Sequence, residues 1–451
     1  MGDRPRRAAI AVIGAGWAGL SSAYRLAARG YQVTLFEASR QLGGRARRVD
    51  WLLPDGTAVA LDNGQHILLG AYRETLELIE LCAVSESDVL LRQPVHINRC
   101  DGFALRAWPL PAPWHVFFGL WAARGIGLRA RLDAVRLMTR ARLKRWRLPS
   151  DCSVASWLSE QDQSSEIIEK LWAPLCVAAL NTPYQIASAQ VFLNVLRDSL
   201  GARRYASDML LPKMPLDAVL PNACAAAILA LEGRIELGTR VDSLLVDPSA
   251  VELTSSSGGS WHFDGCVVAV SANQAVGLIQ RLEGPGISEL LACCASLSWQ
   301  PITTVYFAYP SEVSLPAPMM ALTEDLAQSQ FGQWIFDKGQ LGGPGGLLAV
   351  VISAQGPHQE LDQGTIAQHV LTQLRQQLHL TATPVAYRVI SEKRATFACV
   401  PELRRPPQRT PESRLVLAGD YTESDYPATL ETAVASGRRA AALLEENLAG
   451  L

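Results

Sequence analysis

The chain has 451 residues, more than one hydrophobic core usually holds, so we expect two domains. Its formal net charge of −2 gives no global reason to expect nucleic-acid binding. Nine cysteines without CxxC or metal-ligand spacing indicate reduced thiols, no metal site and a cytoplasmic location. No apolar run reaches the roughly 18 residues that cross a bilayer.

The first predicted elements are a strand, a glycine turn, a helix and a second strand within residues 9 to 47. Gly14 permits a tight turn, Gly16 lets a pyrophosphate approach the backbone, and Gly19 lets the helix pack closely on the strand. Glu37 ends the second strand, where a carboxylate can accept hydrogen bonds from ribose hydroxyls. This order predicts a dinucleotide site with its pyrophosphate at the helix N-terminus.

A second glycine pair follows at once, in the sequence Gly43-Gly44-Arg45. This extension resembles the fingerprint of the flavin amine oxidase and phytoene desaturase superfamily. The resemblance implies that the glycines pass under a flavin diphosphate, where the planar fork of an arginine suits a phosphate. A solvated turn is the alternative interpretation.

The far end of the chain carries a matching pattern in residues 414 to 440. We predict a strand over 415 to 418, a turn at Gly419-Asp420 and a helix from about residue 428. The segment resembles the C-terminal flavin motif of the same superfamily. There the aspartate bonds the ribityl chain, and the helix N-terminus faces the pyrimidine end of the flavin. Two such motifs favour FAD over NAD.

Residues 233 to 272 read as alternating strands that end in a buried strand over 265 to 270. The resemblance implies that Val241 contacts the adenine through its backbone. The full set of residues expected to bind FAD is Gly14, Ala15, Gly16, Trp17, Ala18, Gly19, Glu37, Ala38, Gly43, Gly44, Arg45, Gly64, Gln65, His66, Val241, Gly419, Asp420, Thr429 and Leu430.

We therefore expect an α/β fold in which a Rossmann-type FAD-binding domain is interrupted by a partly helical substrate domain. The FAD-binding domain is predicted to comprise residues 1–70, 205–280 and 386–451. Residues 71–204 and 281–385 are predicted to form the substrate domain.

The segment 114–147 is an aromatic block followed by a predicted helical stretch with nine arginines and lysines against one acid, Asp133. A basic amphipathic helix with tryptophans is attracted to an anionic membrane surface. The segment thus predicts peripheral contact with the inner face of the cytoplasmic membrane. An ordinary solvated helix with an apolar stripe toward the core is the alternative. Nucleic acid is a third interpretation, which nothing else in the chain supports.

Two further segments narrow the resemblance. They are Asp62-Asn63-Gly64-Gln65-His66 and residues 171 to 192, which contain ALNTP. With the flavin motifs, they resemble the squalene-associated FAD-dependent desaturases, the hydroxysqualene dehydroxylases of hopanoid synthesis. That family implies reductive dehydroxylation: hydroxysqualene loses its hydroxyl as water and gains hydride from reduced FAD at an allylic carbon, giving squalene.

This reaction needs a proton donor at the hydroxyl. His66 is the first choice, because imidazole titrates near neutral pH. A histidine that fixes a loop through a backbone bond is the alternative. Asp62, which could instead cap a turn, is a further choice. Tyr421, Asp425 and Tyr426 follow the C-terminal flavin turn and could reach the pocket or, instead, hold a loop.

Other functions remain open at this point. A carotenoid or phytoene-type desaturase would use the same fold in the oxidative direction. A flavin amine oxidase is less favoured, because this sequence has no convincing amine-site signature. A non-catalytic FAD-bound membrane factor is the choice from a different class. The electron donor that reduces FAD is not identified by the sequence.

Overall fold

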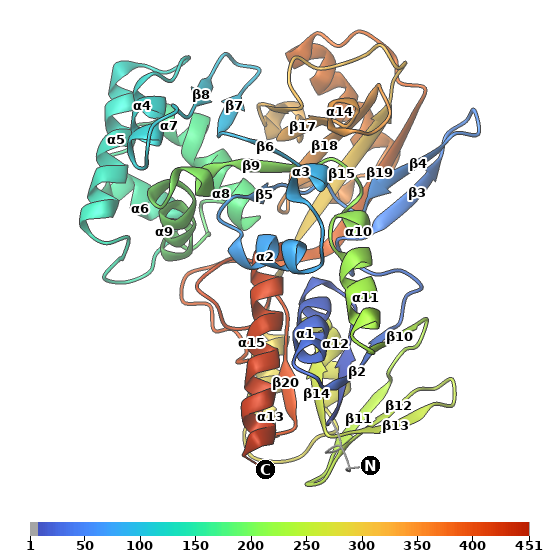
Figure 1. Ribbon diagram of the computed structural model, residues 1–451. Coiled ribbons are helices and arrows are strands. Elements are labelled where there is room, and N and C mark those ends of the chain that lie inside the picture. The colour runs from blue at the N-terminus through green and yellow to red at the C-terminus, as the bar shows by residue number, and fades with distance from the viewer. Residues whose placement is uncertain (1–7, 451) are drawn as a thin grey trace.

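The computed structural model describes residues 8 to 450, so the first seven residues of the predicted segment 1–70 lie outside it. Figure 1 shows a lower part that contains α1, α15 and the parallel strands. The wider upper part has an antiparallel sheet on one side and a group of helices on the other. Within residues 8 to 450, none of the helices combines the length and apolarity needed to cross a membrane.

The lower part is built on a parallel sheet whose strands come from three distant stretches of the chain. Its order is β10-β2-β1-β14-β20, and each neighbouring pair is parallel. Ile10, Ala11 and Val12 of the central strand are fully buried, as expected for a strand covered on both faces. The strands are β1 (Ala9–Ile13), β2 (Gln32–Glu37), β10 (Arg234–Leu237), β14 (Gly265–Val268) and β20 (Leu415–Leu417).

The first and last helices of the chain pack closely against each other. A Cβ atom on Gly437 would lie 2.2 Å from the Ala18 carbonyl oxygen, and the Ser21 hydroxyl donates to the Val434 carbonyl at 2.9 Å. This contact joins the two ends of the chain in one part of the molecule. The helices of this part are α1 (Trp17–Ala28), α10 (Leu216–Val219), α11 (Pro221–Ala230), α12 (Ala272–Ile279), α13 (Ile287–Ala295) and α15 (Leu430–Ala449).

An antiparallel three-stranded sheet, β11-β12-β13, borders the parallel sheet. The ring of Phe36 lies 4.9 Å from that of Trp261 and 5.9 Å from that of Phe263, which fixes this border. The strands are β11 (Ser243–Val246), β12 (Val251–Thr254) and β13 (Ser260–Phe263).

The upper part contains a second five-stranded sheet of order β16-β17-β18-β15-β19, in which all pairs are antiparallel. Its elements are β15 (Trp299–Ala308), β16 (Met319–Ala321), β17 (Trp334–Asp337), β18 (Leu347–Ser353), β19 (Ala386–Phe397) and α14 (Gln363–Leu378). Short 3-10 helices, η4 (Leu326–Gln328), η5 (Gly339–Leu341) and η6 (Pro357–Glu360), connect them. The strand Ala386–Phe397 therefore lies in this sheet, because it pairs with β15. The sequence pattern places the same strand at the start of the predicted FAD-binding segment 386–451.

Smaller sheets also lie in the upper part (Figure 1). In one of them β9 pairs with β5 and β6, so residues 209 to 212 also lie apart from the parallel sheet. The strands are β3 (Arg48–Leu52), β4 (Ala58–Asp62), β5 (Leu68–Leu69), β6 (Leu90–Gln93), β7 (His96–Asn98), β8 (Ala104–Arg106) and β9 (Met209–Pro212).

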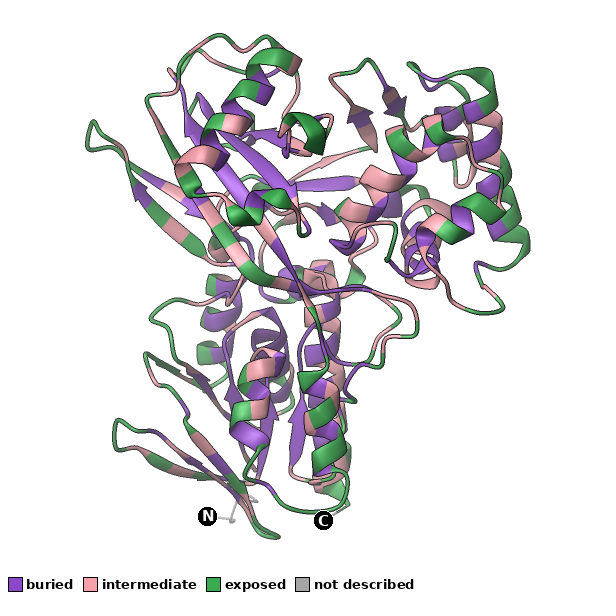
Figure 2. Cartoon of the chain, turned by 180° about the vertical axis from the view of Figure 1, so that it is seen from behind, coloured by how far each residue is buried: buried purple, intermediate pink, exposed green. Residues whose placement is uncertain are grey.

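The remaining helices comprise a helical lobe, residues 114 to 201, and the helices that precede or follow this lobe in the chain. Two of its segments, η1 (Ile168–Trp172) and η2 (Arg197–Gly201), are π-helices, which are rare and often found at functional sites. The others are α2 (Arg73–Leu81), α3 (Glu86–Val89), α4 (Trp114–Trp121), α5 (Leu128–Leu143), α6 (Val154–Glu160), α7 (Ser165–Ile167), α8 (Ala173–Leu180), α9 (Ala189–Leu196) and the 3-10 helix η3 (Arg204–Ser207). Figure 2 shows that both sheets are largely buried, whereas the outer helices alternate between buried and exposed residues.

Candidate cofactor and substrate site

A cavity of about 1670 Å³ runs from the turn after β1 into the upper part of the molecule. Its walls include Gly14 and Gly16 of the turn after β1, Phe336 of the antiparallel sheet and Leu120 and Leu175 of the helical lobe. A small ligand commonly occupies about 300–1000 Å³. This cavity therefore has room for a dinucleotide and a second, long ligand.

Two glycine segments lie side by side at the lower end of the cavity. The Gly43 amide donates to the Ala15 carbonyl at 2.9 Å, and a Cβ atom on Gly44 would lie 3.2 Å from the Gly16 Cα. A Cβ atom on Gly19 would lie 1.8 Å from the Gly14 carbonyl oxygen. Bare backbone thus faces the cavity beside the N-terminus of α1, an arrangement that fits a diphosphate.

Glu37 lies at the carboxyl end of β2 and lines this end of the cavity. Its two carboxylate oxygens accept hydrogen bonds from the Ala15 amide at 2.7 Å and the Ser39 amide at 2.8 Å. These bonds orient the carboxylate while leaving lone pairs available. Ala15 and Gly19 themselves lie outside the cavity lining, so their contributions are a backbone donor and a close helix contact.

The two flavin motifs meet through their side chains. Arg45 donates to both carboxylate oxygens of Asp420 at 2.6 Å and also to the Ala395 carbonyl. Burial acts to lower the pKa of Arg45, but the adjacent Asp420 carboxylate outweighs it and raises that pKa. Both residues line the cavity. Arg45 therefore holds Asp420 in place at the wall where the flavin is expected.

The N-terminus of α15 opens onto the same wall. Thr429 caps the helix by accepting a hydrogen bond from the Thr432 amide at 3.1 Å, and both Thr429 and Leu430 line the cavity. The free amides and dipole of a helix N-terminus favour an electronegative group. The residues present thus fit a flavin dinucleotide at both of its ends.

His66 and Gln65 form part of the wall farther into the cavity. His66 Nδ1 lies 2.7 Å from the Gly64 carbonyl oxygen, so Nδ1 carries the proton and the neutral ring leaves Nε2 as an acceptor. Burial lowers the pKa of His66, and the bond to Gly64 offsets only part of this effect. The Lys338 ammonium donates to Gln65 Oε1 at 3.2 Å.

Asp62 lies outside the lining and is buried behind this wall. Its Oδ1 accepts from the Leu216 amide at 2.7 Å, and its Oδ2 lies 3.9 Å from the Lys338 ammonium. Burial raises the pKa of Asp62 to about 6. These contacts are those of a carboxylate that holds a turn.

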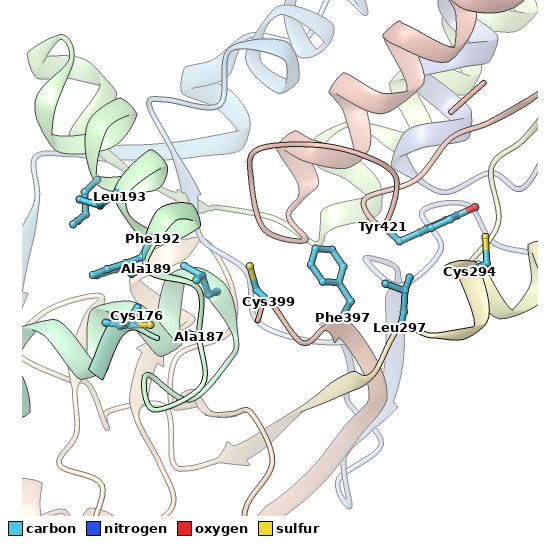
Figure 3. Close-up of a cluster of buried hydrophobic side chains, with 14 of the residues drawn as sticks. Cys176, Ala187, Ala189, Phe192, Leu193, Cys294, Leu297, Phe397, Cys399 and Tyr421 are labelled. Carbon is cyan, nitrogen blue, oxygen red and sulfur yellow. The ribbon is translucent and has the colours of Figure 1, made fainter. Parts of the chain in front are cut away.

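Tyr421 also lies outside the lining. Figure 3 shows its ring in a buried cluster near Cys294 and Leu297, and among the described residues its hydroxyl has no hydrogen-bond partner. Burial raises the pKa of Tyr421 well above its ordinary value. The geometry separates this hydroxyl from the cavity, because its side chain packs into the apolar core.

The upper half of the cavity is mostly apolar. Two charged side chains that sequence motifs did not single out, Glu392 of β19 and Asp198 of η2, interrupt its surface, as does Tyr426. No local pattern marks them, because they reach the cavity through a bulged strand and a π-helix. The apolar lining includes Val95, Ile97, Leu105, Val116, Leu120, Met138, Leu171, Leu175, Val195, Leu196, Leu200, Ile302, Met319, Phe336 and Val351.

The segment 114–147 forms two helices rather than one amphipathic stretch, since the glycines between α4 and α5 interrupt it. On α4, Val116 and Leu120 line the cavity, whereas Trp114 and Trp121 are 54% and 45% exposed. The α5 helix buries Ala130, Ala134, Leu137 and Ala141 against the core. These four residues are therefore covered, whereas the side chains of Arg129, Arg136, Arg140 and Arg142 are exposed.

A comparison with protein families decides the assignment. The family described as flavin containing amine oxidoreductase matches residues 17–444. The chain belongs to this family. As a member, it is an FAD-dependent oxidoreductase, and the predicted α/β fold with FAD as cofactor is confirmed.

Individual proteins resemble this family member over nearly its whole length. Hydroxysqualene dehydroxylases of Rhodopseudomonas palustris and Zymomonas mobilis are 27% and 24% identical, with 96% of this chain and 98% of each relative covered. A zeta-carotene desaturase of Solanum lycopersicum is 23% identical over 96% of this chain and 80% of its own length. A solved oxidoreductase from Methanosarcina mazei has a TM-score of 0.73 at 17% identity, covering 96% of this chain and 99% of that one, which shows a shared fold.

Proposed function

We propose that this oxidoreductase converts hydroxysqualene to squalene. The C–O bond breaks, the oxygen leaves as water, and a C–H bond forms at the same allylic carbon. Reduced FAD supplies the hydride and becomes oxidised FAD. Similarity to hydroxysqualene dehydroxylases over 96% of the chain supports this choice of substrate.

The observation that carries the proposal is the continuity of the glycine cradle with a long apolar cavity. Gly16 and Gly44 line the same cavity as Leu120, Leu175 and Val195. Apolar walls exclude water and accept a hydrocarbon chain without leaving buried polar groups unpaired. A polyisoprenoid suits such a cavity better than a small charged amine does.

Within this proposal, His66 is the proton donor to the departing hydroxyl or the group that stabilises departing hydroxide. It lines the cavity, whereas Asp62 and Tyr421 are buried elsewhere. The lowered pKa of His66 makes its protonated form scarce at neutral pH and correspondingly acidic when formed. The pH dependence of turnover therefore tests this role.

We further propose the division into a discontinuous FAD-binding domain and a substrate domain. Strand pairing supports a last boundary beyond residue 397, since β19 pairs with β15. It also supports grouping β9 with the substrate domain, because β9 pairs with β5 and β6.

A peripheral membrane location is part of the same proposal. The exposed tryptophans of α4 lie on the helix whose other face lines the cavity. Exposed cations of α5 are suited to anionic lipid headgroups. A hydrophobic substrate could then pass from the inner face of the cytoplasmic membrane into the cavity.

The second function to test is an oxidative carotenoid desaturase, which the resemblance to zeta-carotene desaturases favours. It would use oxidised FAD and remove hydrogen from a polyene precursor. A non-catalytic FAD-bound membrane factor would turn over neither compound.

The experiment is anaerobic turnover of purified, chemically reduced enzyme with hydroxysqualene. Flavin reoxidation is followed by absorbance and extracted lipid by mass spectrometry. Squalene formed in a one-to-one ratio with reoxidised flavin supports the dehydroxylase. Zeta-carotene incubated with oxidised enzyme is the parallel arm, and desaturation there without squalene formation in the first arm would favour the alternative function.

A further inference from the structure

A polar network interrupts the apolar wall formed by the helical lobe. The Tyr426 hydroxyl donates to the Asp198 carboxylate and accepts from Arg197 Nη2 at 2.7 Å. Arg197 also donates to the two oxygens of Asp198 at 2.7 and 3.0 Å. Asp198 and Tyr426 both line the cavity. The two residues are 228 positions apart in the chain, so this is a contact of tertiary structure.

The network connects two elements that both contribute to the cavity lining. Tyr426 belongs to the loop that joins the Asp420 turn to α15, and this loop borders the flavin wall. Asp198 belongs to the π-helix η2, and both Leu196, just before this helix, and Leu200, within it, line the apolar part. The network therefore joins the loop next to the expected flavin to the lobe that supplies part of the apolar lining.

The backbone of the loop that carries Tyr426 is held by hydrogen bonds from neighbouring elements. Arg405 donates to the Tyr426 carbonyl at 2.6 Å and to the Ser424 carbonyl at 2.9 Å. Asn194 donates to the Asp425 carbonyl at 2.9 Å. The loop is therefore fastened through its backbone, independently of the tyrosine hydroxyl, and the hydroxyl is not needed merely to attach the loop.

The network offers hydrogen-bond acceptors to the cavity. Burial opposes ionisation of Asp198, but bonds from Arg197 and Tyr426 outweigh it and lower the pKa of Asp198. Burial and the Asp198 carboxylate raise the pKa of Tyr426 to about 12. At neutral pH an ionised carboxylate and a neutral phenol thus remain, each with an unused lone pair.

We propose that Asp198 and Tyr426 recognise the hydroxyl group of an isoprenoid alcohol, with the Asp198 carboxylate accepting a hydrogen bond from the alcohol O–H. They are specificity-determining residues, and Arg197 positions them. The inference rests on the proposed function for the identity of the natural substrate. It adds the two protein side chains that distinguish an alcohol from a hydrocarbon.

This assignment has a consequence for product release. Squalene has no hydroxyl, so once the C–O bond breaks, the hydrogen bond to Asp198 is lost and the network is left facing hydrocarbon. A site built to bond a hydroxyl rejects the analogue that lacks it. The alcohol therefore binds more tightly than the product, although the two share nearly all their apolar surface.

The test measures binding to the FAD-loaded, oxidised enzyme, in which no reductive turnover occurs. The probes are farnesol, an allylic isoprenoid alcohol, and farnesene, a matched hydrocarbon. Loss of one hydrogen bond to a charged group predicts a drop of about 10- to 100-fold in farnesol affinity for Asp198→Ala, with farnesene affinity unchanged. Tyr426→Phe is expected to give a smaller, equally selective loss.

Two further variants separate recognition from structure. Asp198→Asn keeps one acceptor oxygen and is expected to restore part of the farnesol affinity. Asp162→Asn makes the same charge change at an exposed position of the helical lobe, outside the cavity lining, and is expected to bind both probes as the parent does. Flavin content and thermal unfolding confirm that each variant is folded.

The outcomes distinguish this inference from the proposed function. Equal losses for farnesol and farnesene, or no preference for farnesol in the parent enzyme, would overturn the recognition site even if hydroxysqualene is reduced. A selective loss without squalene formation by the parent enzyme would retain the hydroxyl site and overturn the proposed substrate.

Discussion

Arg45 and Asp420 are 375 positions apart in the chain, yet the Arg45 guanidinium contacts both carboxylate oxygens of Asp420 at 2.6 Å. The pair joins the N-terminal and C-terminal flavin motifs across the cavity wall. Each motif is recognisable alone, but the cofactor site exists only where the two meet. The geometry also gives Arg45 a partner within the protein, in addition to the phosphate expected from the sequence.

Breaking this pair is expected to loosen FAD. In Arg45→Met, the Asp420 side chain, which is 9% exposed, loses its cation, and an uncompensated carboxylate is costly. We expect FAD affinity to fall at least about tenfold, measured by titrating apoprotein with FAD. Arg48→Met is the control, because Arg48 and Asp50 form an exposed pair of little energetic value. Equal FAD affinity in both variants would contradict a role for the Arg45 pair.

A second prediction concerns Glu37, whose carboxylate accepts the Ala15 and Ser39 amides. Glu37→Ala removes these bonds and the expected acceptor for the ribose hydroxyls. FAD affinity should fall about 10- to 100-fold, as seen in the flavin retained after dialysis. The exposed Glu236→Ala on the adjacent strand β10 is the control. Unchanged flavin content in Glu37→Ala would argue against its ribose role.

Gly19 is expected to tolerate no side chain. A Cβ atom there would lie 1.8 Å from the Gly14 carbonyl oxygen, so Gly19→Ala must displace either the helix or the turn. Overpacking of this kind costs about 1–3 kcal/mol or more, measurable by urea unfolding. Gly277→Ala has open space around it in α12 and should stabilise the protein by up to about 1 kcal/mol. A neutral Gly19→Ala would show that the turn relaxes freely.

The pH profile tests His66. A general acid works in its protonated form, and burial lowers the pKa of His66 below the ordinary 6.5. The dehydroxylation rate should therefore rise as pH falls through the region below 6.5 and decline as pH rises through it. His66→Ala should retain FAD, lose most turnover and lack this pH dependence. Normal turnover in that variant would remove His66 from the mechanism.

Membrane contact is tested with anionic liposomes. Because Trp114 and Trp121 are exposed on α4, replacing both with serine should reduce liposome binding about tenfold or more. Added salt should weaken the binding of the parent protein by screening the cations of α5. Leu245→Ser, at a position 49% exposed on β11, is the control. Absence of binding at low salt in the parent would defeat the membrane proposal.

Much of the cofactor site was predictable because its signals are local. Gly14, Gly19 and Glu37 belong to one strand–turn–helix–strand unit, in which each residue's task follows from its distance along the chain. The same is true of Gly419 and the start of α15. Backbone geometry over a few residues decides such motifs, so sequence order suffices to find them.

Side-chain direction and long-range pairing were decided only by tertiary structure. Asp62 and Tyr421 lie in segments that reach the site, but packing turns both away from the cavity. Asp198 and Tyr426 meet across 228 positions. The sequence by itself determined the dinucleotide fold and FAD, because those depend on local backbone geometry. Tertiary structure decided which polar groups face the apolar cavity, because that depends on how distant elements pack.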